Sequence, residues 1–383
     1  MMQFQLCNPT HIAFGEGSIA ELGALVPRKS RIMLLYGGGS IKRNGVYQQV
    51  RAALPEAIVT EFGGIEVNPH YETILKAAKQ VRRDNVDLIL AVGGGSVADA
   101  AKFLGAVVHA GGDPWDKLRA DDWPQQIVPV GVVLTLPATG SESNPVSVIT
   151  STVRELKIPF RCEAIRPRFA ILDPSTMATL DRRQRANGAV DAFTHVLEQY
   201  LVAPGNTPVQ FGFSEALLEV LIEWGPMLVE QNTPQARENI MWAANQALNG
   251  LIGAGITQDW STHMIGHALT ELYGVDHARS LTLIMPSLLR YKRGAKQVML
   301  ARYARRVWKV DEADDKRAAE RAIDLTEDFF RRMGCPVRIS ELAPTTVSAG
   351  AVVAHLERAS QTRLGEAGDI QSAQVHEIIA LAA

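Results

Sequence analysis

The feature that most constrains the fold is the alternation of short apolar runs with helical patterns in the first half of the chain. Most of the runs are rich in β-branched residues and lie close to Gly or Pro, which is typical of strands. The predicted strands are Arg31–Tyr36, Ile58–Phe62, Asp87–Val92, Val128–Leu136 and Phe169–Leu172. Helical patterns lie between several of them, for example over Tyr71–Arg83 and Val97–His109. Strands and helices in alternation predict a parallel sheet with helices on its faces.

The second half of the chain differs, because from about Asp181 one amphipathic pattern follows another without a convincing strand between them. The predicted helices are Arg185–Leu201, Val209–Trp224, Ala236–Leu251, Gln258–Tyr273, Lys296–Val310 and Asp315–Met333. A chain of 383 residues is about twice the usual domain length, so two domains are expected. We therefore predict an α/β domain over residues 1–180 and an all-helical domain over residues 181–383.

The composition is that of an ordinary soluble globular protein, with 46% hydrophobic and 21% charged residues. The net charge of −2 argues against nucleic acid as a partner, whose phosphates call for a basic excess. The three cysteines form no CxxC pair, which suits a reducing cytoplasm and excludes a cysteine-based zinc site. The N-terminus lacks the pattern of an export signal, and no apolar run reaches the ~18 residues of a membrane span. We expect a cytoplasmic protein without membrane contact.

A glycine-rich loop, Gly93–Ser96 (GGGS), follows the predicted strand Asp87–Val92 and precedes a helix. Glycines at such a junction let a pyrophosphate approach the backbone closely, and the helix N-terminus supplies free N–H groups and a positive dipole end. Ser96 is placed to cap the helix or to donate to a phosphate, and Asp99, one turn later, to accept from a ribose hydroxyl. The loop lacks the GxGxxG fingerprint, so a tightly packed turn without a ligand is the alternative.

A second GGGS loop, Gly37–Ser40, follows the predicted strand Arg31–Tyr36. Ligands bind outside the carboxyl ends of parallel strands, so two such loops favour a Rossmann-like, dinucleotide-binding first domain. A third segment, Thr135–Asn144 (TLPATGSESN), ends another strand with small and hydroxyl-bearing residues. It is a candidate for the same crevice, and a plain Ser/Thr-rich turn is the alternative.

The second half brings one aspartate and several histidines together at helical spacing. Asp191 and His195 are four residues apart and project from one helix face, and His263 and His267 repeat that spacing. His277 follows soon after, beyond a glycine that we expect to end the helix. Imidazoles with one carboxylate suit Zn²⁺ or Fe²⁺ and are poor ligands for Cu(I) or an iron–sulfur cluster. Core histidines are the alternative, and spacing leaves open which histidine is not a ligand.

These motifs together strongly resemble the iron-containing (group III) alcohol dehydrogenase family. The resemblance rests on GGGSVAD, LPATGSESN, the Asp191/His195 pair and GHALT followed by DHAR, and it runs from FGEGSIAEL near the N-terminus through the late helices. It is closest to NADPH-dependent broad-range aldehyde reductases and butanol-dehydrogenase-like members, through Gly37–Ser40, Ala138–Asn144 and Asn249–Gly255. The family fold, an α/β dinucleotide-binding domain followed by a helical metal-bearing domain, agrees with the two predicted halves.

The resemblance also implies roles for single residues. The implied ligands of one divalent ion are Asp191, His195, His263 and His277. His267 is then the non-ligating histidine near the substrate. The residues implied to bind NADP(H) are Gly38, Ser40, Asn68, Gly94, Gly95, Ser96, Asp99, Thr135, Leu136, Thr139, Asn144 and Lys157, of which Lys157 has the least distinctive surroundings. In some relatives the ion is zinc, so the native metal, Fe²⁺ or Zn²⁺, stays open.

The implied reaction moves a hydride between NADP(H) and a small aldehyde or primary alcohol, with the ion as a Lewis acid on the oxygen. His267 is the expected catalytic proton donor or relay. We expect NADPH to be preferred over NADH, because the loop Gly37–Ser40 is followed by Lys42 and Arg43 and contains no carboxylate to repel a 2′-phosphate. The physiological substrate and the direction of the reaction stay open, and a homodimer is the expected assembly.

Three other hypotheses compete with this one. A glycerol-dehydrogenase-like enzyme, or a dehydroquinate-synthase-like lyase that binds NAD, would carry different residues around the metal ligands from the GHALT and DHAR found here. A metallohydrolase, in which the ion activates water, would leave both glycine loops and the α/β half without a task. A non-enzymatic structural or partner-binding role predicts that replacing the histidines leaves every activity unchanged.

Overall fold

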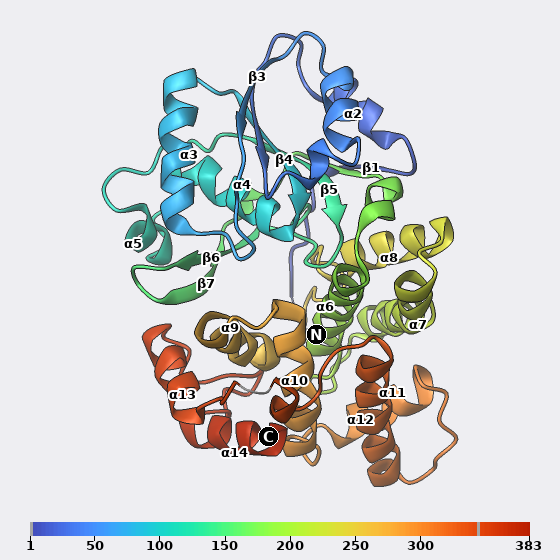
Figure 1. Ribbon diagram of the computed structural model, residues 1–383. Coiled ribbons are helices and arrows are strands. Elements are labelled where there is room, and N and C mark those ends of the chain that lie inside the picture. Colours follow the sequence, from blue (N-terminus) through green and yellow to red (C-terminus); the bar gives the residue numbers. More distant parts are fainter. Residues whose placement is uncertain (1–2, 343–344) are drawn as a thin grey trace. The chain divides into compact units, whose positions relative to one another are not determined.

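The computed structural model describes residues 3–342 and 345–383, and the chain divides into two compact units (Figure 1). One unit is Cys7–Leu180, and the other is Asp181–Ala383 with the segment that ends at Leu6. The predicted fold class, a parallel sheet with helices followed by a helical half, is confirmed. Within the described residues, none of the helices combines the length and apolar character that crossing a bilayer requires.

The first unit is built on a six-stranded parallel sheet in the order β1-β8-β5-β4-β2-β3. Its strands are β1 (His11–Phe14), β2 (Arg31–Tyr36), β3 (Ile58–Phe62), β4 (Leu88–Gly94), β5 (Val130–Leu136) and β8 (Phe169–Leu172). Only β1 was not predicted. It is a four-residue edge strand without a fully buried residue, so it lacks the apolar run by which the others are recognised.

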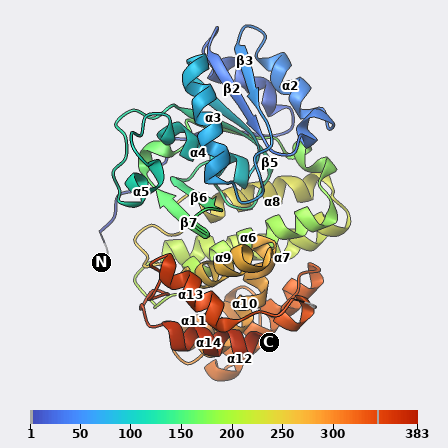
Figure 2. The same ribbon diagram turned by 60° about the vertical axis from the view of Figure 1, so that its left-hand side comes forward.

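Different helices cover the two faces of this sheet (Figure 2). The helices of the unit are α1 (Leu22–Leu25), α2 (Val46–Ala53), α3 (Tyr71–Asp84), α4 (Gly95–Val107) and α5 (Pro114–Arg119). Ile32 and Leu34 of β2 share a core cluster with Val50 of α2. Successive side chains of a strand point to opposite faces, so the buried Met33 and Leu35 face the side of α3 and α4. Burial on both faces explains why the strands read as continuous apolar runs.

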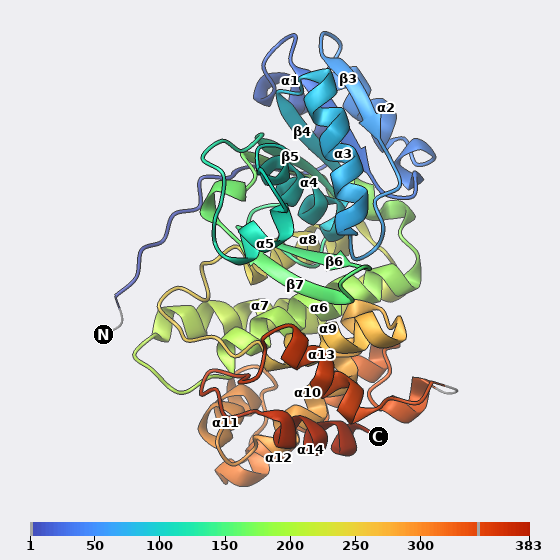
Figure 3. The ribbon, with the colours of Figure 1, turned by 90° about the vertical axis from the view of Figure 1, so that its left-hand side faces the viewer.

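An antiparallel hairpin, β6 (Val146–Ser151) and β7 (Leu156–Arg161), forms a second small sheet that was not predicted. Phe160 of β7 packs against Phe103 of α4 and Trp115 of α5, with ring centroids 4.8 and 5.1 Å apart. Figure 3 shows the hairpin beside α4 and α5. Its residues alternate between polar and apolar, and it covers α4 instead of extending the main sheet.

The second unit is helical throughout its described residues, as predicted. Its helices are α6 (Arg182–Tyr200), α7 (Pro208–Glu230), α8 (Pro234–Ala247), α9 (Ser261–Tyr273), α10 (His277–Tyr291), α11 (Gln297–Arg306), α12 (Asp315–Arg332), α13 (Ala349–Arg358) and α14 (Ser372–Ala382). Helix α6 begins at a capping box formed by Asp181 and Gln184 and is buried along most of its length. Helix α10 is equally buried and packs against α6. The core of this unit therefore surrounds the helices that carry the predicted ligands.

Candidate functional site

Three helices of the second unit bring a carboxylate and three imidazoles together. Asp191 and His195 lie one turn apart on α6, and His263 lies in the first turn of α9. Helix α9 ends at Gly274, whose φ of 66° reverses the chain, so that His277 is the first residue of α10. Asp191, His195 and His263 are buried, whereas His277 is partly exposed.

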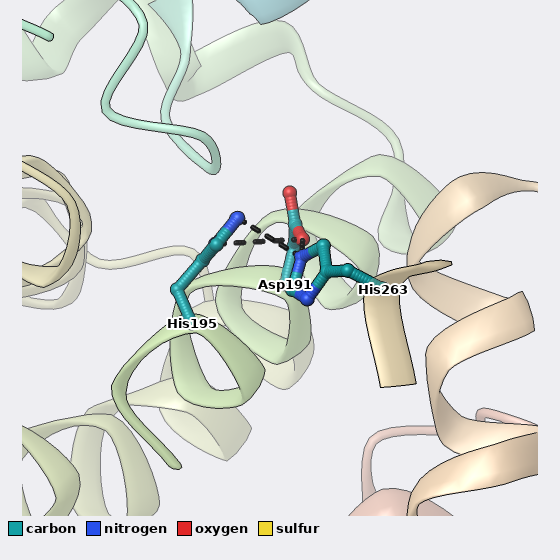
Figure 4. Close-up of side chains that lie close together, drawn as sticks. All are labelled: Asp191, His195 and His263. Carbon is teal, nitrogen blue, oxygen red and sulfur yellow. Dashed lines mark hydrogen bonds and ion pairs between the residues drawn. The ribbon is translucent and has the colours of Figure 1, made fainter. Parts of the chain in front are cut away.

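The four side chains converge on one oxygen. Asp191 Oδ1 lies 3.5 Å from His195 Nδ1, 3.7 Å from His263 Nε2 and 3.6 Å from His277 Nε2. One ligand atom each of Asp191, His195 and His263 lies within 4.8 Å of the other two (Figure 4). His277 falls outside this mutual grouping and approaches it through Asp191. Ligand atoms about 2.0–2.2 Å from a tetrahedral ion are about 3.3–3.6 Å apart, so the spacing suits one divalent ion.

The chemistry of these atoms also fits a cation. Asp191 Oδ1 is buried and accepts no hydrogen bond of normal geometry from a described residue, which costs free energy unless a positive group lies beside it. His263 Nε2 and His195 Nε2 face each other at 3.0 Å, where two lone pairs repel unless a proton or an ion lies between them. Burial would raise the pKa of Asp191, but the imidazoles of His195, His277 and His263 outweigh it and lower the pKa.

Glu198 contacts this cluster through His263. This carboxylate was not predicted from the sequence. It is buried on α6, and its Oε2 contacts His263 Nδ1. Burial would lower the pKa of His263, but Glu198 and Asp191 outweigh it and raise the pKa to about 9. The one available signal was its position on α6, one turn after His195 and two turns after Asp191.

His267 lies beside the cluster and outside the group of candidate ligands among the described residues. It is buried one turn after His263 on α9. Its ring centroid is 6.2 Å from that of His263 and 5.2 Å from that of His277. The structure therefore places the predicted proton donor next to the predicted ligands.

In the first unit, the predicted nucleotide residues gather at the carboxyl ends of three neighbouring strands. Strands β5, β4 and β2 are adjacent and parallel, so the segments that follow them lie at one edge of the sheet. Gly38 and Ser40 follow β2, and Gly94 lies at the junction of β4 and α4. Thr135 and Leu136 are the last residues of β5.

The glycines at the start of α4 allow close packing against the segment after β5. A Cβ on Gly95 would lie 2.5 Å from Thr139 Oγ1, and one on Gly94 would lie 3.2 Å from Leu136 Cβ. The Asn144 side-chain amide donates to the Thr139 carbonyl at 3.0 Å. The residue before α4 is Gly94 and not Ser96, so of the two roles considered for Ser96, donation to a phosphate is the one that stays a prediction.

Asn68 connects Ser96 with Lys157, two predicted residues that are distant in the sequence. The Asn68 N–H donates to Ser96 Oγ at 3.3 Å, and Lys157 Nζ of β7 donates to Asn68 Oδ1 at 2.8 Å. Asn68 has a φ of 59°, a left-handed conformation that asparagine tolerates better than most residues. The β6–β7 hairpin, which was not predicted, thus places Lys157 near the Gly93–Ser96 loop. Lys157 is the predicted cofactor residue with the least distinctive sequence surroundings.

Asp99 and Lys102 of α4 form hydrogen bonds with the segment after β5. Asp99 accepts from Ser141 Oγ and from the Val148 N–H, and burial raises its pKa. Lys102 Nζ lies 3.7 Å from Asp99 Oδ1 and donates to Asn144 Oδ1 at 3.0 Å and to the Asn144 carbonyl at 3.2 Å. Asp99 therefore has a structural role that the sequence did not predict, beside the ribose contact that stays a prediction.

The loop after β2 has a carboxylate for a neighbour, which the sequence did not reveal. Lys42 Nζ lies 2.7 Å from Glu61 Oε2 of β3, and Glu61 also accepts from Tyr47 Oη at 2.6 Å and Tyr36 Oη at 3.2 Å. Lys42 is therefore already paired with an anion, and its contribution to a positive potential is smaller than predicted. The loop itself contains no acidic residue, but the strand next to it supplies one.

Comparison with known proteins covers almost the whole chain. Residues 9–174 match the family model described as iron-containing alcohol dehydrogenase, and residues 185–382 match its C-terminal counterpart. The chain is 46% identical to the NADPH-dependent aldehyde reductase YqhD of Escherichia coli over 97% of both chains. It is 38% identical to the probable NADH-dependent butanol dehydrogenase 1 of Bacillus subtilis over 89% of this chain and 90% of the other. The crystal structure of E. coli YqhD superposes with a TM-score of 0.97 at 44% identity, covering 100% of this chain and 99% of that one.

Proposed function

Because the chain belongs to the iron-containing alcohol dehydrogenase family, we propose that it is a metal-dependent aldehyde reductase or alcohol dehydrogenase that uses NADP(H). The observation that carries the proposal is the buried convergence of Asp191, His195, His263 and His277 on one carboxylate oxygen. These four residues would hold one divalent ion. The proposed substrate class is a small aldehyde or primary alcohol; one relative is named as an aldehyde reductase and the other as a probable butanol dehydrogenase.

When bound, the ion would act as a Lewis acid on the carbonyl oxygen, and the nicotinamide would supply a hydride to the carbonyl carbon. The chain supplies position and protons. Asp191 balances part of the charge of the ion, which a set of neutral imidazoles alone does not. A ring nitrogen of His267 would donate the proton of the alcohol hydroxyl group in aldehyde reduction, and the same nitrogen would accept that proton in alcohol oxidation. His267 suits this role because it is buried beside His263 and His277.

The first unit would bind the dinucleotide at the carboxyl ends of β2, β4 and β5. The backbone N–H groups at the start of α4, together with Ser96, Asn68 and Lys157, form a polar surface suited to the pyrophosphate. We assign the other predicted residues of this edge to the same site. NADPH is our proposed cofactor because the relative at 46% identity is named for it, although the relative at 38% is named for NADH. An uncharged Gly38 in the loop after β2 supports the same choice.

A cytoplasmic location and a homodimer belong to the proposal. The first is supported by three cysteines that form no disulfide among the described residues. Fractionation of cells and light scattering of the purified protein test these two statements. Nucleic acid is not a proposed partner, since the net charge is only −2.

The central test pairs elemental analysis of anaerobically purified protein with NADPH oxidation over a series of small aldehydes. The wild type should contain about one divalent ion per subunit and consume NADPH in step with the aldehyde. His195→Ala should lose the ion and the activity together while its circular dichroism remains that of a folded protein. Full metal content and turnover in this variant would contradict the ligand assignment.

His267→Ala is the matched control, since it removes an imidazole equally buried and beside the same cluster. It should retain the ion and lose ~10²-fold in kcat, the usual contribution of one positioned acid. Metal loss equal to that of His263→Ala would make His267 a ligand instead. Metal-dependent ester or phosphate cleavage without nicotinamide turnover would support the hydrolase hypothesis.

A further inference from the structure

The second nitrogen of His263 has a dedicated partner. Glu198 lies on α6, three residues after His195, and its side chain is only 4% exposed. Its Oε2 contacts His263 Nδ1, on the side of the ring away from Asp191 and His195. A buried carboxylate is costly unless several groups bind it, so this position needs an explanation beyond packing.

The same carboxylate also caps the N-terminus of α9. The N–H groups in the first turn of a helix have no partner within the helix. Here Trp260, which precedes α9, provides no side-chain cap, while Glu198 Oε1 accepts from the Thr262 N–H at 2.6 Å and the His263 N–H at 3.3 Å. Glu198 therefore holds both the backbone and the ring of His263.

The ring contact decides which nitrogen of His263 carries the proton. A carboxylate only accepts, so Nδ1 carries the hydrogen and donates it to Glu198. Binding an ion requires a lone pair on the other nitrogen, Nε2, and this is the atom that lies 3.0 Å from His195 Nε2 and 3.7 Å from Asp191 Oδ1. A partner of this kind on the far nitrogen orients a metal-binding histidine and increases its basicity.

We infer that Glu198 is the positioning residue of the metal centre: it holds His263 in the tautomer and orientation that bind the ion, and it joins α6 to α9 at that point. This inference rests on the metal site proposed above. Glu198 touches neither substrate nor cofactor in this role. Its effect is on metal affinity, and through it on activity.

The test is metal affinity of the apo protein, measured as Zn²⁺ competition against a chromophoric chelator. In Glu198→Gln the amide oxygen can still accept from the two backbone N–H groups, but its NH₂ then faces His263 Nδ1. The proton of His263 moves to Nε2, the atom that must bind the ion, so Zn²⁺ affinity should fall ~10–100-fold. The absorption spectrum of the Co²⁺-loaded variant should also change, because it reports the ligand geometry.

Glu215→Gln is the matched control. Glu215 is a carboxylate of the same unit with 5% side-chain exposure, and it pairs with Arg302 and Tyr200 instead of a histidine. This variant should keep wild-type Zn²⁺ affinity even if its melting temperature falls. Equal weakening in Glu198→Gln and Glu215→Gln would reduce the role of Glu198 to general stability and overturn the inference.

The remaining outcomes separate the two proposals. If His263→Ala binds Zn²⁺ as tightly as the wild type, the metal site itself is wrong. If His263→Ala loses affinity while Glu198→Gln does not, the site stands and the role of Glu198 is refuted. Should Glu198→Gln fail to fold, Glu198→Asp serves instead. Its carboxylate is one methylene shorter and cannot hold both ring and backbone, so unchanged affinity in that variant would also refute the role.

Discussion

At the scale of single residues, the oxygen Oδ1 of Asp191 is the common neighbour of the proposed metal ligands. It is the shared neighbour of three imidazoles, and the described residues give it no hydrogen-bond donor. An asparagine has nearly the same shape but removes the negative charge, which is the property that a divalent ion requires of this position. The carboxylate here is thus matched to a cation and not to another hydrogen-bonding side chain.

We expect cofactor choice to depend on single residues as well, at the loop after β2. Gly38 has open space where a Cβ would point, and its φ lies outside the left-handed region, so Gly38→Asp fits without strain. A carboxylate about 5 Å from the 2′-phosphate costs about 3 kcal/mol at an effective dielectric near 20. NADPH affinity should fall on the order of a hundredfold, with a much smaller effect on NADH. The measurement is kcat/KM for both cofactors in the wild type and the variant.

Two controls make this prediction sharp. Gly38→Asn has a similar size and no charge, so it should leave most of the preference for NADPH in place. Equal or better use of NADH by the wild type would contradict the proposed cofactor. An unchanged preference in Gly38→Asp would remove this loop from the explanation.

The residues that the sequence did not reveal are carboxylates whose partners are distant in the chain. Glu61 meets Lys42 because β3 pairs with β2, and Glu198 meets His263 because α6 packs beside the start of α9. The spacing of Asp191 and His195 is local and therefore visible in the sequence. Contacts between elements depend on strand order and helix packing, which the pattern along one element does not contain.

At the scale of elements, the strands and helices with strong periodicity were predicted, and those set by their surroundings were not. Strands β2, β4 and β5 carry continuous apolar runs, whereas the β6–β7 hairpin alternates polar and apolar residues and packs on α4. Helix α10 was not predicted; it begins soon after Gly274, and most of its residues are buried. Helices α13 and α14 were not predicted either.

Lys102 shows how one element holds another in place. It is fully buried on α4 and donates to Asn144, which lies in the segment after β5. Lys102→Met keeps the length of the side chain but leaves Asp99 and the Asn144 carbonyl without this partner. The free energy of unfolding at pH 7 should fall by about 2–4 kcal/mol. Urea denaturation of both proteins, with the exposed Lys79→Met of α3 as the control, measures the change.

The same pair of proteins gives a pH dependence of known sign. Burial lowers the pKa of Lys102 from 10.5 to about 8, so the folded protein releases this proton before the unfolded chain does. The burial penalty is full below pH 8 and is relieved as the pH rises from 8 to 10.5. The stability of the wild type relative to Lys102→Met should increase over that window by on the order of 3 kcal/mol. A flat or falling difference would show that burial does not govern this lysine.

At the scale of the whole molecule, every proposed metal ligand comes from the unit Asp181–Ala383. An ion bound only by the folded state stabilises that unit by about 2.7 kcal/mol at a free concentration one hundred times Kd. Hydrogen exchange should therefore slow by up to about 100-fold in α6, α9 and α10 when Zn²⁺ is added to the apo protein. The amides of β4, which belong to the other unit, are the internal control. Equal protection in β4 would contradict a site confined to the helical unit.

The order of the ligands along the chain has a consequence for how the protein is made. His277 follows His195 by about eighty residues, and α9 and α10 lie between α6 and the C-terminal helices. A ribosome adds about 5–20 residues each second, so several seconds pass between the synthesis of His195 and that of His277. Until His263 is synthesised, the nascent chain offers only two of the four proposed ligands. If these four residues are the ligands, the complete set exists only after His277 has been synthesised, and by then the whole of the unit Cys7–Leu180 has been made.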